Sequence, residues 1–368
     1  MRIANDDVSQ FLTKMAPYVN EDGARNLNKI SRELSIPYQT LRFRMLRLKE
    51  QGINILPVIN AEALGLQRIR VMFDLAKDVT NLSSLFGGLH QTAGLHYYSR
   101  SLVSQRFDCE FMIPVGSRSE LHRLLGALEE MEIVSNLEIR ALEWKEVLMM
   151  KTQSYDYEQE QWDVDFSHLT SDPSLKIPSP VPSNDFDHTD LLIVKSLQTD
   201  PWVKVVDLAK QLKVTEGDVS YHLNRHVFGK RQVPAFRLKW VGNPEAWAKH
   251  SVLGMTLVFR SIPDESARHA MSIVTSLPFT WNHMRADDGT YLTELLVPTK
   301  HLNESLQYLS DNLREMNLLP EILYPDWSGS SNYTVPYMIH DDQSGWRFNA
   351  EESLGYILQM MQAYRTKS

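Results

Sequence analysis

The amino-acid sequence predicts an α+β protein built from two tandem copies of one module, a helix-turn-helix domain followed by a small domain of strands and helices. Three observations predict this class. They are a long-range internal repeat, a three-helix pattern with a tight turn that occurs twice, and the same order of strands and helices after each occurrence. A chain of 368 residues has the length for about two to four compact domains.

The internal repeat relates residues 30–36 to residues 208–214. Their apolar positions coincide at a shift of 178 residues, which places Leu34 on Leu212. Further along, Phe73 meets Phe259 at a shift of 186, and short loop insertions explain the drift. Residues 171–183, between the copies, are rich in Pro and Ser and predict a semi-extended linker.

Each copy begins with three short helices. In the second copy the apolar spacing predicts helices over residues 190–197, 205–212 and 216–226. Thr215 suits the N-cap of the last of them. The equivalent helices of the first copy are expected at residues 8–18, 27–34 and 38–51. The short turn before each third helix is typical of a helix-turn-helix, whose third helix enters a major groove.

A strand-rich domain follows each helical unit. Apolar residues 53–59 and 233–241 predict a wing or hinge strand. The order strand, helix, strand, strand, helix, strand is then expected over residues 68–75, 79–89, 94–100, 107–115, 119–131 and 134–144, and again over residues 253–261, 266–277, 280–285, 291–298, 302–316 and 318–327. This βαββαβ order predicts a ferredoxin-like fold, an antiparallel sheet with both helices on one face. The open face needs a cover, which pairing of two sheets would supply.

Six segments result from this division. They are a helix-turn-helix domain at residues 1–60, a ferredoxin-like domain at 61–166, a Pro/Ser linker at 167–186, a second helix-turn-helix domain at 187–242, a second ferredoxin-like domain at 243–349 and a C-terminal helix at 350–368. The tails at residues 154–166 and 332–348 are expected either to dock on a neighbour or to close their own domain. Leu354, Ile357, Leu358 and Met361 lie along one face of the C-terminal helix, which is expected to pack within the fold or across a dimer.

Composition excludes several classes of function. No apolar segment approaches the roughly 20 residues that span a bilayer, and the first residues are too acidic and polar for a secretory signal, which predicts a cytoplasmic protein without a membrane partner. The single cysteine, Cys109, cannot form an internal disulfide and is expected to pack as a small hydrophobe. The absence of GxxxxGK, HExxH and GxSxG motifs lowers the expectation of a hydrolase or a nucleotide-hydrolysing enzyme.

Charge is distributed unevenly. The net charge of -8 disfavours indiscriminate nucleic-acid binding, yet residues 25–50 hold seven Lys and Arg against two Glu. The third helix of the first copy would turn Leu41, Met45 and Leu48 inward. Its candidate DNA-binding residues are Tyr38, Gln39, Arg42, Arg44, Arg47 and Lys49. Glutamine and arginine read base edges through paired hydrogen bonds, although a solvated surface helix also carries such charges.

The equivalent helix of the second copy is far less basic. Its candidate DNA-binding residues are Thr215, Ser220, His222 and Arg225. This helix is therefore expected to bind DNA weakly, to read a different site, or to serve as a structural or partner-binding element.

Residues 186–200, FDHTDLLIVKSLQTD, and residues 206–212, VDLAKQL, resemble the opening of the Lrp/AsnC transcriptional regulators of archaea and bacteria. In that family a helix-turn-helix precedes an ACT-like (RAM) sensing domain. The resemblance implies a sequence-specific regulator of the archaeal type, not an enzyme, that binds double-stranded DNA. It also implies a homodimer or an internal pseudo-dimer paired through the sheet domains, and in many members a small-molecule effector. No catalytic residue, metal or cofactor is expected on this interpretation.

Two other hypotheses remain open. Some relatives with two such modules decarboxylate a modified tetrapyrrole of the siroheme type, using histidine, tyrosine and arginine around one strand of the sensing fold. Residues 96–100, HYYSR, and residues 281–285, WNHMR, fall at that strand in the two copies, and each keeps a His and an Arg. The third hypothesis is an adaptor that does not bind DNA and holds partners with its sheet domains.

Overall fold

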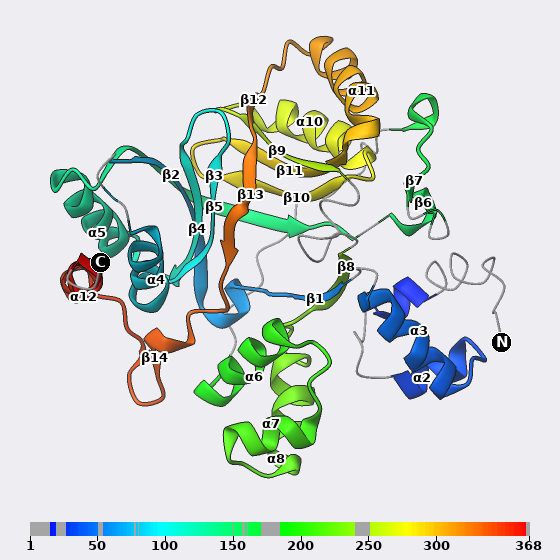
Figure 1. Cartoon of the computed structure of the whole chain (residues 1–368), viewed down its shortest axis with the longest axis horizontal. Coiled ribbons are helices and arrows are strands. Elements are labelled where there is room, and N and C mark those ends of the chain that lie inside the picture. The colour runs from blue at the N-terminus through cyan, green and yellow to red at the C-terminus, as the bar shows by residue number, and fades with distance from the viewer. Residues whose placement is uncertain are drawn as a thin grey trace.

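The computed structural model describes residues 15–19, 27–50, 54–76, 79, 81–149, 151–156, 159, 161–170, 185–239 and 251–365. Their order of elements confirms the α+β class and the tandem ferredoxin-like plan (Figure 1). Residues 8–14 of the first expected helix and residues 171–184 of the linker lie outside the described residues.

The first helix-turn-helix unit contains a helical stretch at residues 15–19, α2 (Leu27–Glu33) and α3 (Tyr38–Glu50). Leu41, Met45 and Leu48 of α3 are buried, as their spacing predicts. The turn between α2 and α3 contains Ser35 in the left-handed region, at φ 52°. Its geometry brings α3 across α2 and leaves the other face of α3 in solvent.

Capping residues mark the helix ends of the second helix-turn-helix unit. Asp187 caps α6 (His188–Thr199), and its side chain forms a capping box with Asp190. Helix α7 (Val205–Leu212) ends at Lys213, which adopts a left-handed φ of 58°. Thr215 and Asp218 form a second capping box at the start of α8 (Glu216–Tyr221). The third helix then continues as a π-helical turn, η4 (His222–Val227).

The two ferredoxin-like domains share one sheet of nine strands. Its order is β12-β9-β11-β10-β5-β2-β4-β3-β13. The strands of the first copy are β2 (Leu66–Leu75), β3 (Leu95–Ser101), β4 (Phe107–Pro114) and β5 (Val134–Val147). Those of the second copy are β9 (Val252–Phe259), β10 (Thr280–Ala286), β11 (Tyr291–Pro298), β12 (Glu321–Leu323) and β13 (Pro325–Asn332).

The last strand segment of each copy pairs with a strand of the other copy. Strand β5 pairs with β2 through Ala141 and then with β10 from Leu142 onward. The expected strand at residues 318–327 divides in the same way, because β12 pairs with β9 whereas β13 crosses to β3. The strands β12 and β13 are almost consecutive in the chain yet stand at opposite ends of the sheet order. Because so few residues join β12 to β13, the two ends of the sheet lie near one another. Each copy therefore covers part of the other copy's sheet within the same chain.

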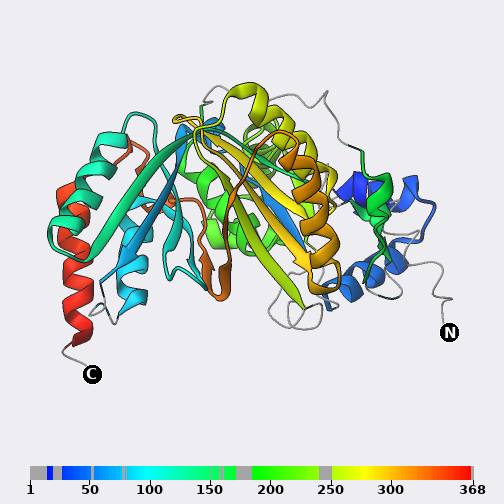
Figure 2. The same cartoon turned by 90° about the horizontal axis from the view of Figure 1, so that it is seen from above.

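Helices cover the outer faces of the two half-sheets. Figure 2 shows the halves as two arms inclined to one another, with α4 (Leu82–Ala93), α5 (Arg118–Glu130) and α12 (Ala350–Arg365) outside one arm, and α10 (Asp264–Ser276) and α11 (Leu302–Arg314) outside the other. The C-terminal helix α12 belongs to the second copy but packs on α4 and α5 of the first. Its Ile357 is fully buried in that core.

The tail segments also dock on the opposite copy. Trp162, in the hairpin of β6 (Tyr155–Asp156) and β7 (Gln161–Trp162), packs edge-on against Phe279 at 5.3 Å between ring centroids. Trp346, in the hairpin of β14 (His340–Asp341) and β15 (Gly345–Trp346), donates its indole N–H to the Leu64 carbonyl at 2.9 Å. Both tails therefore join the two halves of the chain.

The wing strands of the two helix-turn-helix units pair with each other. Strand β1 (Asn54–Val58) runs antiparallel to β8 (Ala235–Lys239), in a register that sets Leu56 opposite Arg237. In Figure 1 this ribbon lies between the helical units and the large sheet. The ribbon brings side chains of both copies to one place beneath the sheet.

The contact of α12 with α4 makes a sharp prediction about two neighbouring glycines. A Cβ at Gly88 would lie 2.9 Å from Ile357 Cγ1 and 3.3 Å from Ile357 Cα, whereas a Cβ at Gly87 would meet only Met360 Cε at 3.9 Å. Gly88→Ala is expected to lower the free energy of unfolding by about 1–3 kcal/mol through overpacking. Gly87→Ala is expected to raise it by about 0.5–1 kcal/mol, since alanine favours a helix interior. Urea unfolding of both variants checks this, and equal effects would contradict it.

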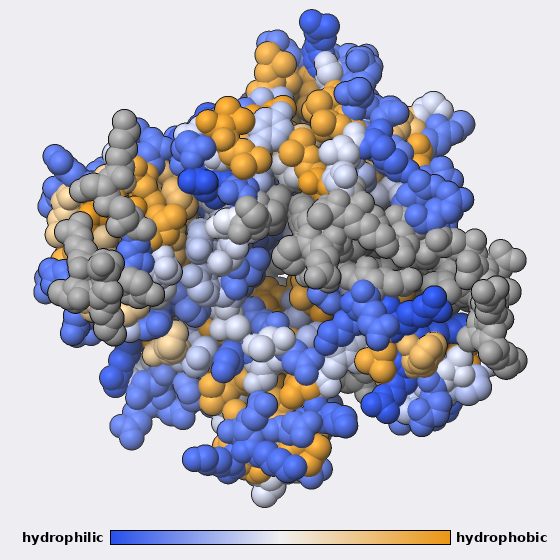
Figure 3. Space-filling view, viewed as in Figure 1, coloured by the Kyte–Doolittle hydropathy of each residue, from blue (hydrophilic) through white to orange (hydrophobic). Residues whose placement is uncertain are grey.

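No helix among the described residues has both the length and the apolar character to cross a membrane. On the face drawn in Figure 3, hydrophobic groups lie as separate patches among hydrophilic ones.

Candidate functional site

A cavity of about 480 Å³ lies where the β1–β8 ribbon meets the large sheet. This volume falls in the range of small-molecule sites, about 300–1,000 Å³. Both copies line it. The lining residues with polar or aromatic side chains include Arg68, His96, Tyr97 and Lys145 of the first copy and Arg237, Lys239, Trp281, Asn282, Glu294 and Tyr333 of the second.

A buried ionic network extends from the cavity wall into the sheet and joins the two copies. Arg70 of β2 donates from Nη2 to Asp108 Oδ2 at 2.6 Å and to Glu294 Oε1 at 2.8 Å. Asp108 lies on β4 of the first copy and Glu294 on β11 of the second. Arg70 is 1% exposed, so these contacts are shielded from water. A single guanidinium therefore holds carboxylates from both halves of the sheet.

Glu110, on β4, is surrounded by three cations, Arg68, Arg70 and Lys145. Arg68 Nη1 lies 2.6 Å from its Oε1, and Lys145 Nζ lies 2.6 Å from its Oε2. Burial opposes ionisation of this carboxyl, but Lys145, Arg68 and Arg70 together hold the pKa of Glu110 well below its usual value. Burial likewise opposes ionisation of Glu294, yet Arg70 and Lys145 lower its pKa. Both glutamates are therefore carboxylates at neutral pH.

Two further cations line the cavity without a carboxylate contact among the described residues, Arg237 and Lys239 of β8. Arg237 lies over the Trp281 ring at 3.3 Å from its centroid and donates to Asn282 Oδ1 at 3.0 Å. Burial lowers the pKa of Arg237 to about 9. Burial, with the charge of Arg237, lowers the pKa of Lys239 to about 8. Both side chains still carry most of their charge at neutral pH.

The balance of charge indicates the kind of ligand. Four cations, Arg68, Lys145, Arg237 and Lys239, line the cavity together with one carboxylate, Glu294. Arg70, Asp108 and Glu110 lie behind this lining and are joined to it by ion pairs. Buried charge is costly unless it is paired. The excess of positive charge, with the Trp281 and Tyr333 rings on the wall, suits an anionic ligand with a flat face.

His96, on β3, is the histidine of the cavity. Burial, with the nearby charges of Arg68 and Lys145 opposing Glu110, lowers the pKa of His96 to about 3. The imidazole is therefore neutral at physiological pH. Its Nδ1 is buried and has no hydrogen-bond partner within the described residues. A neutral imidazole with an unpartnered nitrogen suits coordination of a transition metal carried by a ligand.

The low pKa of His96 predicts a specific effect of pH on stability. The unfolded chain titrates this group near pH 6.5 and the folded chain near pH 3, so the unfolded state binds the extra proton between these values and acidification destabilises the fold. His96→Gln is expected to reduce the slope of the free energy of unfolding against pH by close to one proton, or about 1.4 kcal/mol per pH unit between pH 6 and 4. Urea titrations at several pH values measure the slope, and equal slopes for both proteins would refute the assignment.

The structure places the predicted DNA-binding residues away from the cavity. On α3, Tyr38, Gln39, Arg42, Arg47 and Lys49 are exposed and Arg44 is half-buried. In the second unit, Thr215 and Arg225 are exposed, and Ser220 and His222 are half-buried. None of these ten residues is among those that line the cavity.

The two strand segments singled out for the enzyme hypothesis divide at the cavity. His96, Tyr97, Trp281 and Asn282 line it. His283 is instead fully buried, with Nε2 2.8 Å from Glu146 Oε2. Arg285 contacts Asp264 at 2.7 Å and Arg100 contacts Asp326 at 3.7 Å, so both arginines are engaged elsewhere.

The charged residues of the cavity and of the ionic network behind it were not predicted from the sequence, although the sequence contains a signal for some of them. Arg68 and Arg70 occupy alternate positions on β2, and Asp108 and Glu110 occupy alternate positions on β4, so each pair lies on one face of a largely buried strand. Charges at alternate positions of a buried strand predict a functional face. Arg237 and Lys239 show the same spacing on β8.

Comparison with known proteins adds a full-length likeness. The sequence matches no family model and none of the curated proteins. The fold is similar to that of the siroheme decarboxylase NirDL, with a TM-score of 0.55, 14% identity, and coverage of 98% of this chain and 99% of that chain. NirDL in co-complex with an iron-uroporphyrin III analogue gives a TM-score of 0.56 at 14% identity, covering 98% of this chain and 100% of that chain. AsnC of E. coli covers 41% of this chain and 99% of its own, at 11% identity and a TM-score of 0.30.

These similarities correct the main functional expectation. The sequence predicts a DNA-binding regulator that is not an enzyme, but two solved structures that match 98% of the chain are those of an enzyme, so the comparison contradicts this prediction. AsnC of E. coli matches over 41% of the chain, whereas NirDL matches over 98%.

Proposed function

We propose that the chain is a decarboxylase whose substrate is an iron tetrapyrrole with carboxylate side chains, of the siroheme class. The observation that carries the proposal is the shared cavity, where an excess of cations and a neutral histidine face aromatic walls. The full-length similarity to a siroheme decarboxylase supports it, since the fold can hold such a substrate.

The cations are suited to bind the carboxylates at the rim of such a ring. Arginine pairs with a carboxylate through two parallel hydrogen bonds. Arg237 is well placed for this role because its stacking on Trp281 holds the guanidinium plane without consuming its charge. Arg68 and Lys145 already form ion pairs with Glu110. They would therefore contribute to the positive potential of the cavity and orient a second carboxylate of the substrate.

His96 is suited to contact the iron of the substrate. The nitrogen that coordinates iron must carry a free electron pair, and the low pKa of His96 supplies a neutral imidazole across the physiological range. Trp281 and Tyr333 would pack against the faces of the macrocycle. Tyr333 is held in place by stacking on His90, at 4.2 Å between ring centroids.

The reaction needs a proton donor. Decarboxylation of an acetate side chain breaks the bond between the methylene carbon and the carboxylate, releases CO₂ and leaves the electron pair on the carbon. One proton delivered to that carbon completes a methyl group, with no net oxidation or reduction. Lys239 suits this step because it lines the cavity and its pKa of about 8 leaves the ammonium mostly protonated at neutral pH but a stronger acid than an ordinary lysine. Solvent then returns the proton to Lys239.

Incubation of the purified chain with siroheme tests the proposal. The expected results are a shifted Soret band on mixing and, by mass spectrometry, a product that has lost CO₂. His96→Ala is expected to change the bound spectrum. A wild-type protein that neither shifts the spectrum nor releases CO₂ from siroheme would overturn the proposal.

A further inference from the structure

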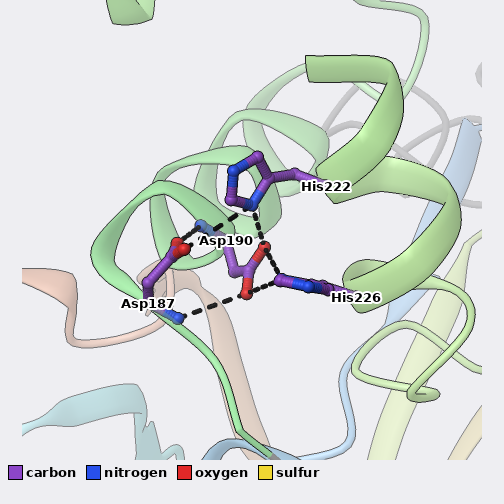
Figure 4. Close-up of side chains that lie close together, drawn as sticks. All are labelled: Asp187, Asp190, His222 and His226. Carbon is purple, nitrogen blue, oxygen red and sulfur yellow. Dashed lines mark hydrogen bonds and ion pairs between the residues drawn. The ribbon is translucent and has the colours of Figure 1, made fainter. Parts of the chain in front are cut away.

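The second helix-turn-helix unit gathers four metal-ligating side chains away from the cavity. They are Asp187, Asp190, His222 and His226, and one ligand atom of each lies within 4.8 Å of the others. Figure 4 shows the four side chains pointing toward one another, the carboxylates from the start of α6 and the imidazoles from the third helix. None of the four lines the cavity described above.

The local sequence explains this convergence. Asp187 and Asp190 are the N-cap and third residue of α6, and their reciprocal capping hydrogen bonds fix both carboxylates. His222 and His226 are four residues apart and project to one side of the π-helical turn. π-helical turns occur frequently at functional sites. At the 178-residue shift, the first copy has Arg44 and Leu48 in place of the two histidines, so the helix-turn-helix fold itself does not require the cluster.

The contacts within the cluster are close to those of a metal site. His222 Nδ1 lies 2.8 Å from Asp190 Oδ1, and His226 Nδ1 lies 2.9 Å from Asp190 Oδ2. His222 Nδ1 also lies 3.7 Å from Asp187 Oδ2. Ligand atoms about 2.0–2.1 Å from zinc in a tetrahedron are about 3.3–3.4 Å apart. Reaching that geometry would lengthen the two shortest pairs by about half an ångström and draw together the pairs that are farther apart, all of which lie within 4.8 Å.

The charge of the cluster also calls for a cation. Asp190 is fully buried, and the ion pairs that the described residues give it are with the two histidines. A buried carboxylate is costly unless it is paired, and a divalent cation held between the carboxylates and the imidazoles would supply the positive charge. Two nitrogen and two oxygen donors favour zinc over magnesium or calcium.

We propose that Asp187, Asp190, His222 and His226 form a zinc site that fastens the start of α6 to the third helix of the second helix-turn-helix unit. The imidazoles bind through Nδ1 and each aspartate through one carboxylate oxygen. Zinc on these ligands would stabilise this unit, because a bound metal adds its binding free energy to folding. The site does not depend on the decarboxylase proposed above.

The proposal is tested by titrating the metal-free full chain with zinc chloride and measuring the heat of binding by calorimetry. One zinc ion per chain is expected, together with a rise in the melting temperature. Cobalt(II) in place of zinc is expected to give the visible absorption of a tetrahedral site. His226→Gln is expected to weaken zinc binding by about 100-fold or more, beyond the loss caused by removing a group that only orients a ligand.

Two variants complete the design. Asp187→Asn keeps a good N-cap but removes a charged ligand, so it decides the question if His226→Gln fails to fold. His168→Gln removes an exposed histidine that contacts Asp165 at 2.7 Å and is expected to bind zinc like the wild type. Absence of zinc binding by the wild type, or affinity in the folded cluster variants equal to that of the wild type, would overturn the proposal.

Discussion

Replacing Arg70 by methionine is expected to lower the free energy of unfolding by about 3–5 kcal/mol. The substitution keeps an unbranched side chain of similar size but leaves Asp108 and Glu294, whose side chains are only 10% exposed, without the guanidinium that contacts both. The loss would fall on the contact between the two copies, because Glu294 comes from the second. Urea unfolding at neutral pH measures the change.

An exposed arginine supplies the control for this prediction. Arg260 contacts Glu138 at 2.9 Å and Glu321 at 2.7 Å, with a side chain that is 41% exposed. Arg260→Met is expected to cost about 0–1 kcal/mol, as for other surface ion pairs. Adding Glu294→Gln to Arg70→Met is expected to restore part of the stability, since it removes an unpaired charge. An Arg70→Met protein as stable as Arg260→Met would show that the network does not hold the halves together.

Lys239→Met is expected to lower kcat for siroheme decarboxylation by about 10²–10⁴-fold, the usual contribution of a general acid. The wild-type kcat/KM is expected to fall as pH rises through about 8, because the ammonium that donates the proton is lost there. Lys239→Arg would keep the charge for binding carboxylates but donate poorly, so it is expected to retain KM and lose kcat without this alkaline limb. Steady-state kinetics across pH measure both effects.

Lys300→Met is the matched control for lysine loss. Lys300 is exposed and contacts Gln161 at 2.9 Å, outside the cavity. Its replacement is expected to leave kcat and its pH profile unchanged. A Lys239→Arg enzyme with wild-type kcat would show that Lys239 acts through its charge alone and that the proton comes from another group.

The fold was largely predictable because its signals are local. Alternating apolar residues and turn residues mark most strands to within a few positions, as with residues 107–115 for β4 (Phe107–Pro114). The exception is the strand expected at residues 318–327. It divides at Tyr324 into β12 and β13, because its second half finds its partner, β3, in the other copy. A partner so distant in sequence leaves no local pattern.

The cavity was less predictable for the same reason. His96, Lys145 and Arg237 come from three strands that the pairing of the two copies brings together. The basic residues of α3 lie within eight residues of one helix and are therefore conspicuous, and the exposure of Arg42, Arg47 and Lys49 agrees with the helical spacing. Such a local cluster of charge favours a DNA-binding interpretation, whereas the alternating charges of β2 and β4 gain their meaning only when the two copies pair.

The exchange of strands and tails gives the cavity two unlike walls. A homodimer would face a ligand with two identical sets of side chains. Here the equivalent positions of the two copies hold different residues. His96 of the first copy corresponds to Trp281 of the second, and Tyr97 corresponds to Asn282. A flat molecule whose edges differ would therefore be received in one orientation, which a symmetric assembly of identical subunits has no means to impose.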